Sequence, residues 1–411
     1  TDDNEMKPVP GYEEDGLLQY DLAEESERMD TATELKILRE AYDEMRHRYA
    51  ERFGITAAVA QDAAAEQVSA PAPQPIDRHY FESYAGHDIH QTMIGDSVRT
   101  LSYAKFLLSP ANAHLIRGKT VMDVGCGSGI LSLFCARAGA KQVLAIDASD
   151  VVERARANIE DNGFGHVVRV FRGRIEALDE VLAPWAGKVD LIVSEWMGYF
   201  LLYESMLDTV LLARDKYLRP DGIMMPDHAT LYLSAIEDQE YKEEKIDFWD
   251  NVYGFDYSCI KEIALREPLV DTVELRSVVC DPAPLVDLDL MTVKKEDLQF
   301  KVPFKLHATR NDYVHAFLGW FDIGFEACHK PVRFSTGPHS RYTHWKQTVF
   351  YTPGTLTVAQ GDVIQGTLSC MPNARNNRDL DICIAYKLDG ANPVEDSMDY
   401  KMYVFSHKRY G

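Results

Sequence analysis

Short aliphatic runs alternate with longer helical patterns between about residues 77 and 225. The runs at 120–124, 142–146, 167–171 and 189–194 predict strands, and the stretches 129–138 and 151–162 predict helices. Alternation of this kind predicts a parallel sheet with helices on both faces. We therefore expect the first folded part of the chain to be an α/β domain.

The pattern changes after about residue 226. Short β-branched and aromatic runs at 229–236, 314–321, 347–351 and 381–387 predict a mostly antiparallel β-domain. Within it, residues 238–265 follow a helical pattern and carry Trp249, Tyr253, Phe255 and Tyr257. An aromatic arm is typical of an association surface. The alternative is a helical insertion that packs on its own domain.

The first 76 residues have a different composition. Residues 1–30 are acidic and predict a disordered leader, and residues 55–76 predict an Ala/Pro linker. Between them, residues 31–54 predict an amphipathic helix with a narrow apolar stripe. The stripe consists of Leu35, Leu38, Tyr42, Met45 and Tyr49. Three heptads are marginal for a coiled coil, so we expect this helix to pack against the body of the protein.

The charge of the chain indicates the kind of partner it attracts. Its 411 residues predict two or three domains and carry a net charge of -22. Residues 1–30 hold eleven acids and two bases, which gives -9 and leaves -13 on the remaining 381 residues. An acidic body disfavours direct nucleic-acid binding and attracts cationic proteins, although solubility alone is the alternative reading.

Cysteine spacing and hydropathy indicate the compartment. No run of 18 apolar residues is present and no secretory leader follows Thr1, so we expect neither a membrane span nor secretion. The seven cysteines include no Cys-x-x-Cys pair, which predicts reduced thiols and no metal site. We expect the protein in the cytoplasm, with the nucleus as a second compartment.

Residues 121–131, VMDVGCGSGIL, predict a buried strand that enters a glycine turn and then a helix. Gly125, Gly127 and Gly129 let the backbone approach a ligand closely. Asp147 ends the next strand, eighteen residues after Gly129, where a carboxylate can hold both hydroxyls of a ribose. Together these features predict a nucleoside-containing cofactor.

The charge beside the glycine turn bears on which cofactor binds. The turn reads Gly-x-Gly-x-Gly, and Asp123 precedes it. A fixed negative charge disfavours a pyrophosphate at the helix start and suits a cationic ligand such as S-adenosylmethionine. A dinucleotide-dependent oxidoreductase is the alternative on these residues alone.

Residues 194–207, SEWMGYFLLYESML, place Glu195 and Glu204 in a loop of aromatic and aliphatic side chains. The loop follows a predicted strand at the carboxyl edge of the sheet, where open parallel sheets bind ligands. Two carboxylates in an apolar wall repel each other, and a planar guanidinium can pair with both. We therefore expect an arginine side chain as the ligand; two surface glutamates in a loose loop are the alternative.

Several segments together resemble the protein arginine N-methyltransferases, from about residue 77 to the C-terminus. They are Tyr80-Phe81-Glu82-Ser83-Tyr84, the glycine turn, the double-glutamate loop and Thr343-His344-Trp345. The resemblance implies a Rossmann-like methyltransferase domain at 77–225 and a β-barrel domain at 226–411 with a dimerisation arm at about 238–265, hence a homodimer. The run EWMGYFLLYESMLD is most similar to the branch with an N-terminal zinc finger, although the first cysteine here is Cys126.

The resemblance also implies roles for matching residues. Glu195 and Glu204 hold the substrate guanidinium, and either His344, oriented by Asp96, or Glu204 takes the released proton. Arg99 pairs with the methionine carboxylate of S-adenosylmethionine, Asp147 with its ribose and Glu176 with its adenine. The other implied cofactor contacts are His90, Tyr80, Tyr84, Asp123, Gly125, Gly127 and Gly129. Met93, Met206 and Trp345 line the arginine pocket, and methionine at position 93 goes with asymmetric dimethylation.

We therefore expect a type I protein arginine methyltransferase that acts on cationic, Gly/Arg-rich proteins, with ribosomal and RNA-binding proteins as candidate substrates. One alternative is methylation of a small molecule or a nucleic acid on the same cofactor fold. Another is a scaffold without activity, which the presence of all the motif residues disfavours.

Overall fold

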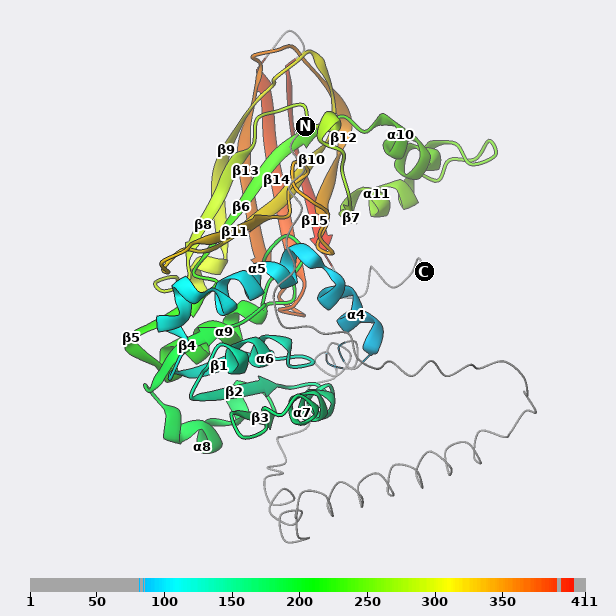
Figure 1. Cartoon of the computed structure of the whole chain (residues 1–411). Helices are drawn as coiled ribbons and strands as arrows, with labels where there is room; N and C mark the ends of the chain where they lie inside the picture. The colour runs from blue at the N-terminus through cyan, green and yellow to red at the C-terminus, as the bar shows by residue number, and fades with distance from the viewer. Residues whose placement is uncertain (1–80, 82–83, 85, 390–392, 403–411) are drawn as a thin grey trace, which may run out of the picture. The chain divides into compact units, whose positions relative to one another are not determined.

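The computed structural model describes residues 81, 84, 86–389 and 393–402. The expected acidic leader (1–30), amphipathic helix (31–54) and linker (55–76) lie outside the described residues, as does Tyr80. The described part begins with helices and a parallel sheet and continues into a β-domain that bears a helical arm (Figure 1).

The first domain is built on five parallel strands in the order β3-β2-β1-β4-β5. They are β1 (Thr120–Val124), β2 (Gln142–Asp147), β3 (Val168–Arg172), β4 (Val189–Val193) and β5 (Leu218–Met225). Val121 pairs with Val143 on one side and with Leu191 on the other, so β1 is central and buried on both faces. An almost wholly apolar strand is typical of that position. The predicted parallel sheet is confirmed.

Helices precede the sheet and connect its strands. They are α4 (His87–Gly95), α5 (Ser97–Leu108), α6 (Ile130–Arg137), α7 (Val152–Asp161), α8 (Asp179–Leu182) and α9 (Met206–Tyr217), with 3₁₀ turns at Pro110–Leu115, Ile175–Ala177 and Ala183–Trp185. The chain runs from β1 outward to β3 and then returns to β4 beside β1. The carboxyl ends of β1 and β4 therefore flank the point where the strand order reverses, which is where such sheets bind ligands.

The second domain consists of two antiparallel sheets. One has the order β7-β12-β10-β6-β8, with β11 paired to β10, and the other has the order β15-β14-β13-β9. The strands are β6 (His228–Ile236), β7 (Leu269–Asp271), β8 (Ala283–Asp289), β9 (Phe300–His307), β10 (Asp312–Phe325), β11 (Val332–Ser335), β12 (Gln347–Val358), β13 (Val363–Pro372), β14 (Leu380–Asp389) and β15 (Val394–Met402), with 3₁₀ turns at Leu275–Ser277 and Lys295–Leu298. β8 contacts β9 and β12 contacts β15, so the two sheets close into a barrel. The predicted fold class is confirmed.

The helical arm lies between β6 and β7 and projects from the barrel (Figure 1). It consists of α10 (Gln239–Tyr241), a π-helical turn Lys242–Ile246, a 3₁₀ turn Asp247–Asp250 and α11 (Ser258–Arg266). Ile246 and Leu265 pack on the barrel beside Leu318, whereas Tyr253 is 96% exposed and Phe255 is 69% exposed. The base of the arm is thus anchored on its own domain, and its aromatic tip is open.

Asp227 lies at the junction between the domains, buried just after the cis peptide Met225-Pro226. One carboxylate oxygen accepts from the Glu326 N–H at 2.7 Å, and the other accepts from the Ala327 N–H at 2.5 Å. The Asp227 side chain therefore ties the start of β6 to the end of β10.

Replacing this carboxylate should destabilise the fold. In Asp227→Ala, two backbone N–H groups lose their acceptor, and an unsatisfied buried polar group costs about 1–3 kcal/mol. We expect the free energy of unfolding in urea to fall by at least this amount. In the control Asp221→Ala, the side chain removed is 76% exposed, so the change should stay within about 0.5 kcal/mol. Equal losses in the two variants would contradict the role of the junction.

Candidate active site

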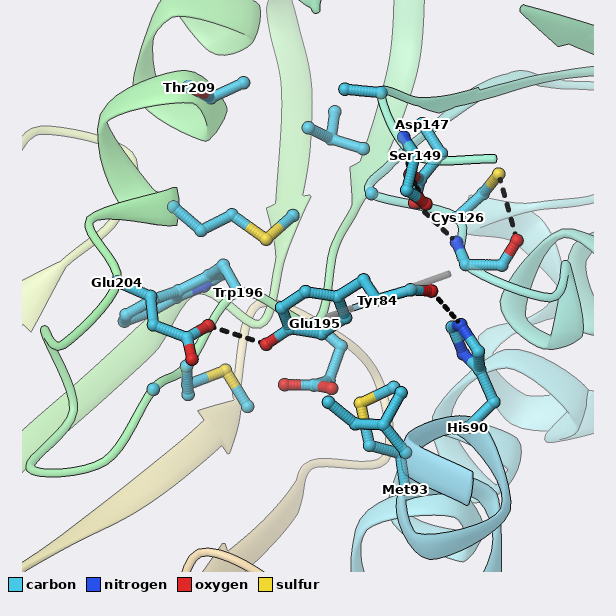
Figure 2. A pocket seen from close by; sticks show the side chains of 18 of the residues that line it. Tyr84, His90, Met93, Cys126, Asp147, Ser149, Glu195, Trp196, Glu204 and Thr209 are labelled. Carbon is cyan, nitrogen blue, oxygen red and sulfur yellow. Dashed lines mark hydrogen bonds between the residues drawn. The ribbon is translucent and has the colours of Figure 1, made fainter. Parts of the chain in front are cut away.

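A cavity of about 290 Å³ opens at the carboxyl ends of β1, β2 and β4. Small-molecule sites span roughly 300–1,000 Å³, so its volume lies close to the lower limit of that range. The structure brings most of the expected site residues to its wall: Tyr84, His90, Met93, Arg99, Gly125, Gly127, Asp147, Glu176, Glu195, Glu204, Met206, His344 and Trp345. Figure 2 shows six of them, Tyr84, His90, Met93, Asp147, Glu195 and Glu204. Gly129, Asp123 and Asp96 are not part of the lining, and Asp96 contacts two residues that are, Arg99 and His344.

The glycine turn after β1 has left-handed backbone at Gly125 and Gly127. Gly125 has a φ of 73°, and a Cβ there would lie 2.1 Å from the Met206 Cε. Gly127 has a φ of 53°, and a Cβ there would lie 3.4 Å from the His90 ring. The left-handed backbone at both positions selects glycine. The turn thus presents bare backbone to the cavity.

Asp147, at the end of β2, supports this turn from within. One carboxylate oxygen accepts from the Gly127 N–H at 2.9 Å. The other accepts from both the N–H and the hydroxyl of Ser149, at 2.8 and 2.7 Å. The expected ribose contact is therefore a carboxylate already fixed by three donors, and Ser149 is a contributor that sequence reasoning missed.

Asp123 does not face the cavity, in contrast to its expected role as a cofactor contact. It is fully buried on β1, and the Ser132 hydroxyl from α6 donates to its Oδ2 at 2.7 Å. The alternating sides of a strand explain the difference, because neighbouring residues point to opposite faces. Burial raises the pKa of Asp123 to about 7, although the hydrogen bond from Ser132 opposes the shift.

The double-glutamate loop is tightly folded. Phe200, Leu201, Glu204 and Ser205 all have a positive φ, a conformation that costs about 1–3 kcal/mol per residue and persists only where the surroundings hold it. Six apolar side chains of the loop are no more than 7% exposed: Trp196, Met197, Phe200, Leu201, Leu202 and Tyr203. A loose surface loop is therefore excluded.

The barrel holds the apolar part of this loop. The Phe200 ring lies so close to β10 that a Cβ at Gly319 would be 2.4 Å from it, and its centroid is 5.1 Å from that of Phe350. The Trp345 indole N–H donates to the Met197 carbonyl at 2.8 Å. Phe350, Trp345 and Gly319 of the second domain therefore hold the double-glutamate loop of the first domain in place.

Glu195 is paired with Arg99. The Arg99 Nε and Nη2 lie 2.7 and 2.6 Å from the same oxygen of Glu195, Oε2, and the Arg99 Nη1 donates to the Met93 carbonyl at 3.1 Å. Both side chains are almost fully buried, and a buried carboxylate needs such a partner. The expected contact of Arg99 was with the methionine carboxylate of the cofactor. The structure places it in the cavity but on Glu195.

Glu204 is oriented by the N-terminal segment. The Tyr84 hydroxyl donates to Glu204 Oε2 at 2.6 Å, a short, charge-assisted bond. Figure 2 shows Tyr84 between Glu204 and His90, whose Nε2 lies 2.8 Å from the Tyr84 carbonyl oxygen. The two glutamates thus hold their positions through donors from different elements.

His344 is fixed by Asp96, which also caps α5. Asp96 Oδ1 accepts from the Arg99 N–H, and Oδ2 accepts from the His344 N–H and lies 2.8 Å from His344 Nδ1. Burial alone would raise the pKa of Asp96, but these hydrogen bonds outweigh it and lower the pKa below its usual value. An ionised carboxylate only accepts, so the proton between them belongs to Nδ1.

Glu176 follows β3 in the 3₁₀ turn Ile175–Ala177. The Thr209 hydroxyl from α9 donates to it at 2.9 Å, and the Arg174 Nε lies 3.5 Å away. Thr209 and Arg174 also line the cavity, and the sequence pattern had pointed to neither.

The lining suits a cationic nucleoside cofactor. Four carboxylates, of Asp147, Glu176, Glu195 and Glu204, face the cavity with three guanidinium groups, of Arg99, Arg174 and Arg378. The bare glycine backbone leaves space that any side chain would fill. Among the residues that the structure describes, no group of three His, Cys, Asp or Glu side chains could hold a metal ion, and no helix is both long and apolar enough to cross a membrane.

The pKa of Asp123 predicts a pH-dependent stability. Because it is raised from 3.8 to about 7, the native state binds this proton more tightly, and the stabilisation present below pH 3.8 is lost as the pH rises to 7. Asp123→Asn removes that loss. Urea titrations give the free energy of unfolding of the variant and of the parent at each pH. The difference, variant minus parent, should rise by a few kcal/mol between pH 4.5 and 7.5, because each pKa unit corresponds to about 1.4 kcal/mol. A difference that does not vary with pH would contradict the assignment.

Comparison with known proteins agrees with this geometry. The family models for the "Arginine methyltransferase oligomerization subdomain" and for the "Ribosomal protein L11 methyltransferase (PrmA)" match residues 227–391 and 106–224. Protein arginine N-methyltransferase 1 of Schizosaccharomyces pombe is 56% identical over 328 residues, 79% of this chain and 95% of that protein. Its counterpart in Chlamydomonas reinhardtii is 52% identical over 350 residues, 84% and 99% of the two chains.

A solved structure is also similar, the Trypanosoma brucei PRMT1 enzyme-prozyme heterotetrameric complex with AdoHcy. The matched chain is 44% identical, with a TM-score of 0.75 over 78% of this chain and 100% of that one. This chain belongs to the protein arginine N-methyltransferase family.

Proposed function

We propose that the protein transfers methyl groups from S-adenosylmethionine to arginine side chains of cationic, Gly/Arg-rich proteins, giving monomethyl and then asymmetric dimethyl arginine. The observation that carries this is the position of Glu195 and Glu204 in one wall of the cavity, beside a bare glycine turn. The family to which the chain belongs supports it. Methylation of a small molecule or a nucleic acid is the alternative, and the paired carboxylates favour a guanidinium over both.

The two glutamates make a poor nucleophile competent. A guanidinium is effectively always protonated and its lone pairs are delocalised. Glu195 and Glu204 draw positive charge towards the nitrogens they contact and leave the attacking nitrogen richer in electrons. They also fix its direction, which supplies much of the advantage. When bound, S-adenosylmethionine supplies an electrophilic methyl group on a positively charged sulfur.

The attacking nitrogen must also lose a proton, because the methylated guanidinium keeps a single positive charge. Two groups of this chain can accept it. His344 lines the cavity and its Nδ1 is fixed by Asp96, which leaves Nε2 as the accepting nitrogen. Glu204 is the second candidate, since its carboxylate is part of the same wall.

The remaining residues of the cavity hold the cofactor and shape the pocket. We assign Arg99 to the carboxylate of the cofactor, Asp147 to its ribose hydroxyls and Glu176 to its adenine amino group, with His90 and Tyr84 as further contacts; all five residues line the cavity. The side chain of Asp147 is short, and its carboxylate is hydrogen-bonded to Ser149 and to the glycine turn, which lie beside it in the cavity. Met93 and Met206 line the arginine pocket, and methionine at position 93 directs the second methyl group to the same nitrogen.

The protein acts as a homodimer in the cytoplasm, with the nucleus as a second compartment. The open aromatic tip of the arm supports dimerisation, as does the match of the barrel to an oligomerization subdomain. Free cysteines at the seven described positions suit a reducing compartment. Its net charge of -22 suits cationic substrates, among them ribosomal and RNA-binding proteins, rather than direct binding to nucleic acid.

Glu204→Gln tests the proposed chemistry. The amide keeps the shape but not the charge, so transfer to a Gly/Arg-rich peptide should fall at least on the order of 100-fold, by analogy with the loss of one electrostatic stabiliser. Calorimetric affinity for S-adenosylmethionine should change little. Mass spectrometry of the parent's product, with fragmentation that separates the two dimethyl isomers, should show the asymmetric one.

A control is Glu180→Gln, an exposed carboxylate on α8. Undiminished transfer in Glu204→Gln would overturn the proposal. Labelling of RNA or small metabolites but not of peptide would favour the alternative.

The aromatic arm predicts the oligomeric state. Replacing both Tyr253 and Phe255 with serine should convert a dimer to a monomer at micromolar concentration in sedimentation velocity, because exposed aromatic side chains dominate such contacts. Tyr313→Ser is the matched control, since this tyrosine is 52% exposed but lies on β10, outside the arm. A parent protein that is fully active as a stable monomer would refute this prediction.

A further inference from the structure

The backbone around Glu204 is held in an unusual conformation. Glu204 and Ser205 have φ angles of 76° and 55°, and neither is glycine. Side chains other than glycine adopt this region reluctantly, so an external contact must hold these two residues. Ser205 immediately precedes α9, but its side chain makes no capping hydrogen bond to that helix. The support therefore has to come from another part of the fold.

That support is the turn between β13 and β14 of the barrel. The Glu204 N–H donates to the Arg378 carbonyl at 2.9 Å, and the Arg378 Nη1 donates back to the Glu204 carbonyl at 2.9 Å. The Ser205 hydroxyl donates to the Asn377 carbonyl. The N–H and the carbonyl of Glu204 are thus both bonded to a single residue of the second domain.

The turn is itself held by hydrogen bonds between its own residues. The Asn373 Oδ1 accepts from the N–H groups of Arg375 and Asn376, at 2.9 and 3.2 Å. The Asn376 Oδ1 accepts from the Arg378 N–H at 3.2 Å. Asparagine side chains that bond to nearby backbone in this way fix the course of a turn. Arg378 is therefore held at its backbone before it contacts Glu204.

Arg378 also contacts the segment that orients the Glu204 carboxylate. Its guanidinium carbon lies 5.4 Å from the centroid of the Phe81 ring, within the range of a cation–π contact. Three residues later, the Tyr84 hydroxyl donates to Glu204 Oε2 at 2.6 Å. One arginine thus touches the backbone of Glu204 and the segment that holds its side chain.

We propose that Arg378 is a positioning residue for methyl transfer, which acts through Glu204 and supports its carboxylate from the barrel side. This proposal rests on the proposed catalytic role of Glu204. Misplacing a reacting group by about 1 Å can cost a rate factor on the order of 100. Losing this support should therefore lower kcat more than it changes cofactor binding.

The experiment compares Arg378→Ala, Arg378→Lys and the control Arg375→Ala in the full chain. Arg375 is an exposed arginine of the same turn, and removing it changes the net charge by the same amount. With a Gly/Arg-rich peptide, Arg378→Ala should lower kcat on the order of 10- to 100-fold. Lysine keeps the charge but not the planar fork, so Arg378→Lys should recover only part of kcat. Arg375→Ala should match the parent.

A second comparison shows whether Arg378 acts through Glu204. If it does, Glu204→Gln and the double variant Glu204→Gln with Arg378→Ala should have the same residual kcat, because the support has nothing left to position. Should Arg378→Ala fold poorly, Ser205→Ala removes the neighbouring hydroxyl contact and should lower kcat in the same direction.

Three results for kcat would overturn the inference. They are a parental kcat in Arg378→Ala, an equal loss in Arg375→Ala, and losses that multiply in the double variant. A loss confined to the affinity for S-adenosylmethionine would likewise assign Arg378 to cofactor binding alone. These outcomes differ from failure of the proposed function, which would appear as full transfer in Glu204→Gln with Arg378 intact.

Discussion

Two carboxylates of like charge stand in one wall made mostly of apolar side chains, and the surrounding structure has to hold them there. A buried carboxylate is costly unless donors meet it. Arg99 supplies two N–H groups to Glu195, and Tyr84 supplies a hydroxyl to Glu204. These partners come from α5 and from the segment before α4, so the helices that precede the sheet are as necessary to the wall as the loop that carries the glutamates.

The barrel contributes to the catalytic wall. It seats the Phe200 ring against β10, binds the Met197 carbonyl through Trp345, and provides His344 beside Asp96. Arg378 adds reciprocal hydrogen bonds to the Glu204 backbone. The methyltransferase half alone would lack these restraints, and a loop with four left-handed residues would have little reason to keep its shape.

Sequence reasoning succeeded where the signal is local. Strand β1, the glycine turn and both glutamates lie in short stretches whose pattern fixes their conformation, and each is found where it was expected. Strand β5 was missed because Pro220, Asp221 and Gly222 interrupt its apolar run. These residues can end a strand pattern even where a parallel neighbour continues it.

The site was less predictable where residues far apart in the chain meet. Arg99 and Glu195 are separated by 96 positions, and Glu204 and Arg378 by 174. No local periodicity encodes such pairs. Asp123 was assigned to the cofactor by its proximity in sequence to the glycine turn, yet the strand directs its side chain towards α6. Proximity along the chain and orientation in the fold are separate properties.

The contact between Phe200 and Gly319 has a consequence for how this protein can diverge. The ring leaves no room for even a methyl group on β10, and the glycine there is required by packing rather than by its backbone angles. A larger residue at position 319 is tolerable only with a smaller one at position 200, so the two sites should accept correlated substitutions and resist independent ones. The methyltransferase loop and the barrel strand are in this sense obliged to evolve as a pair.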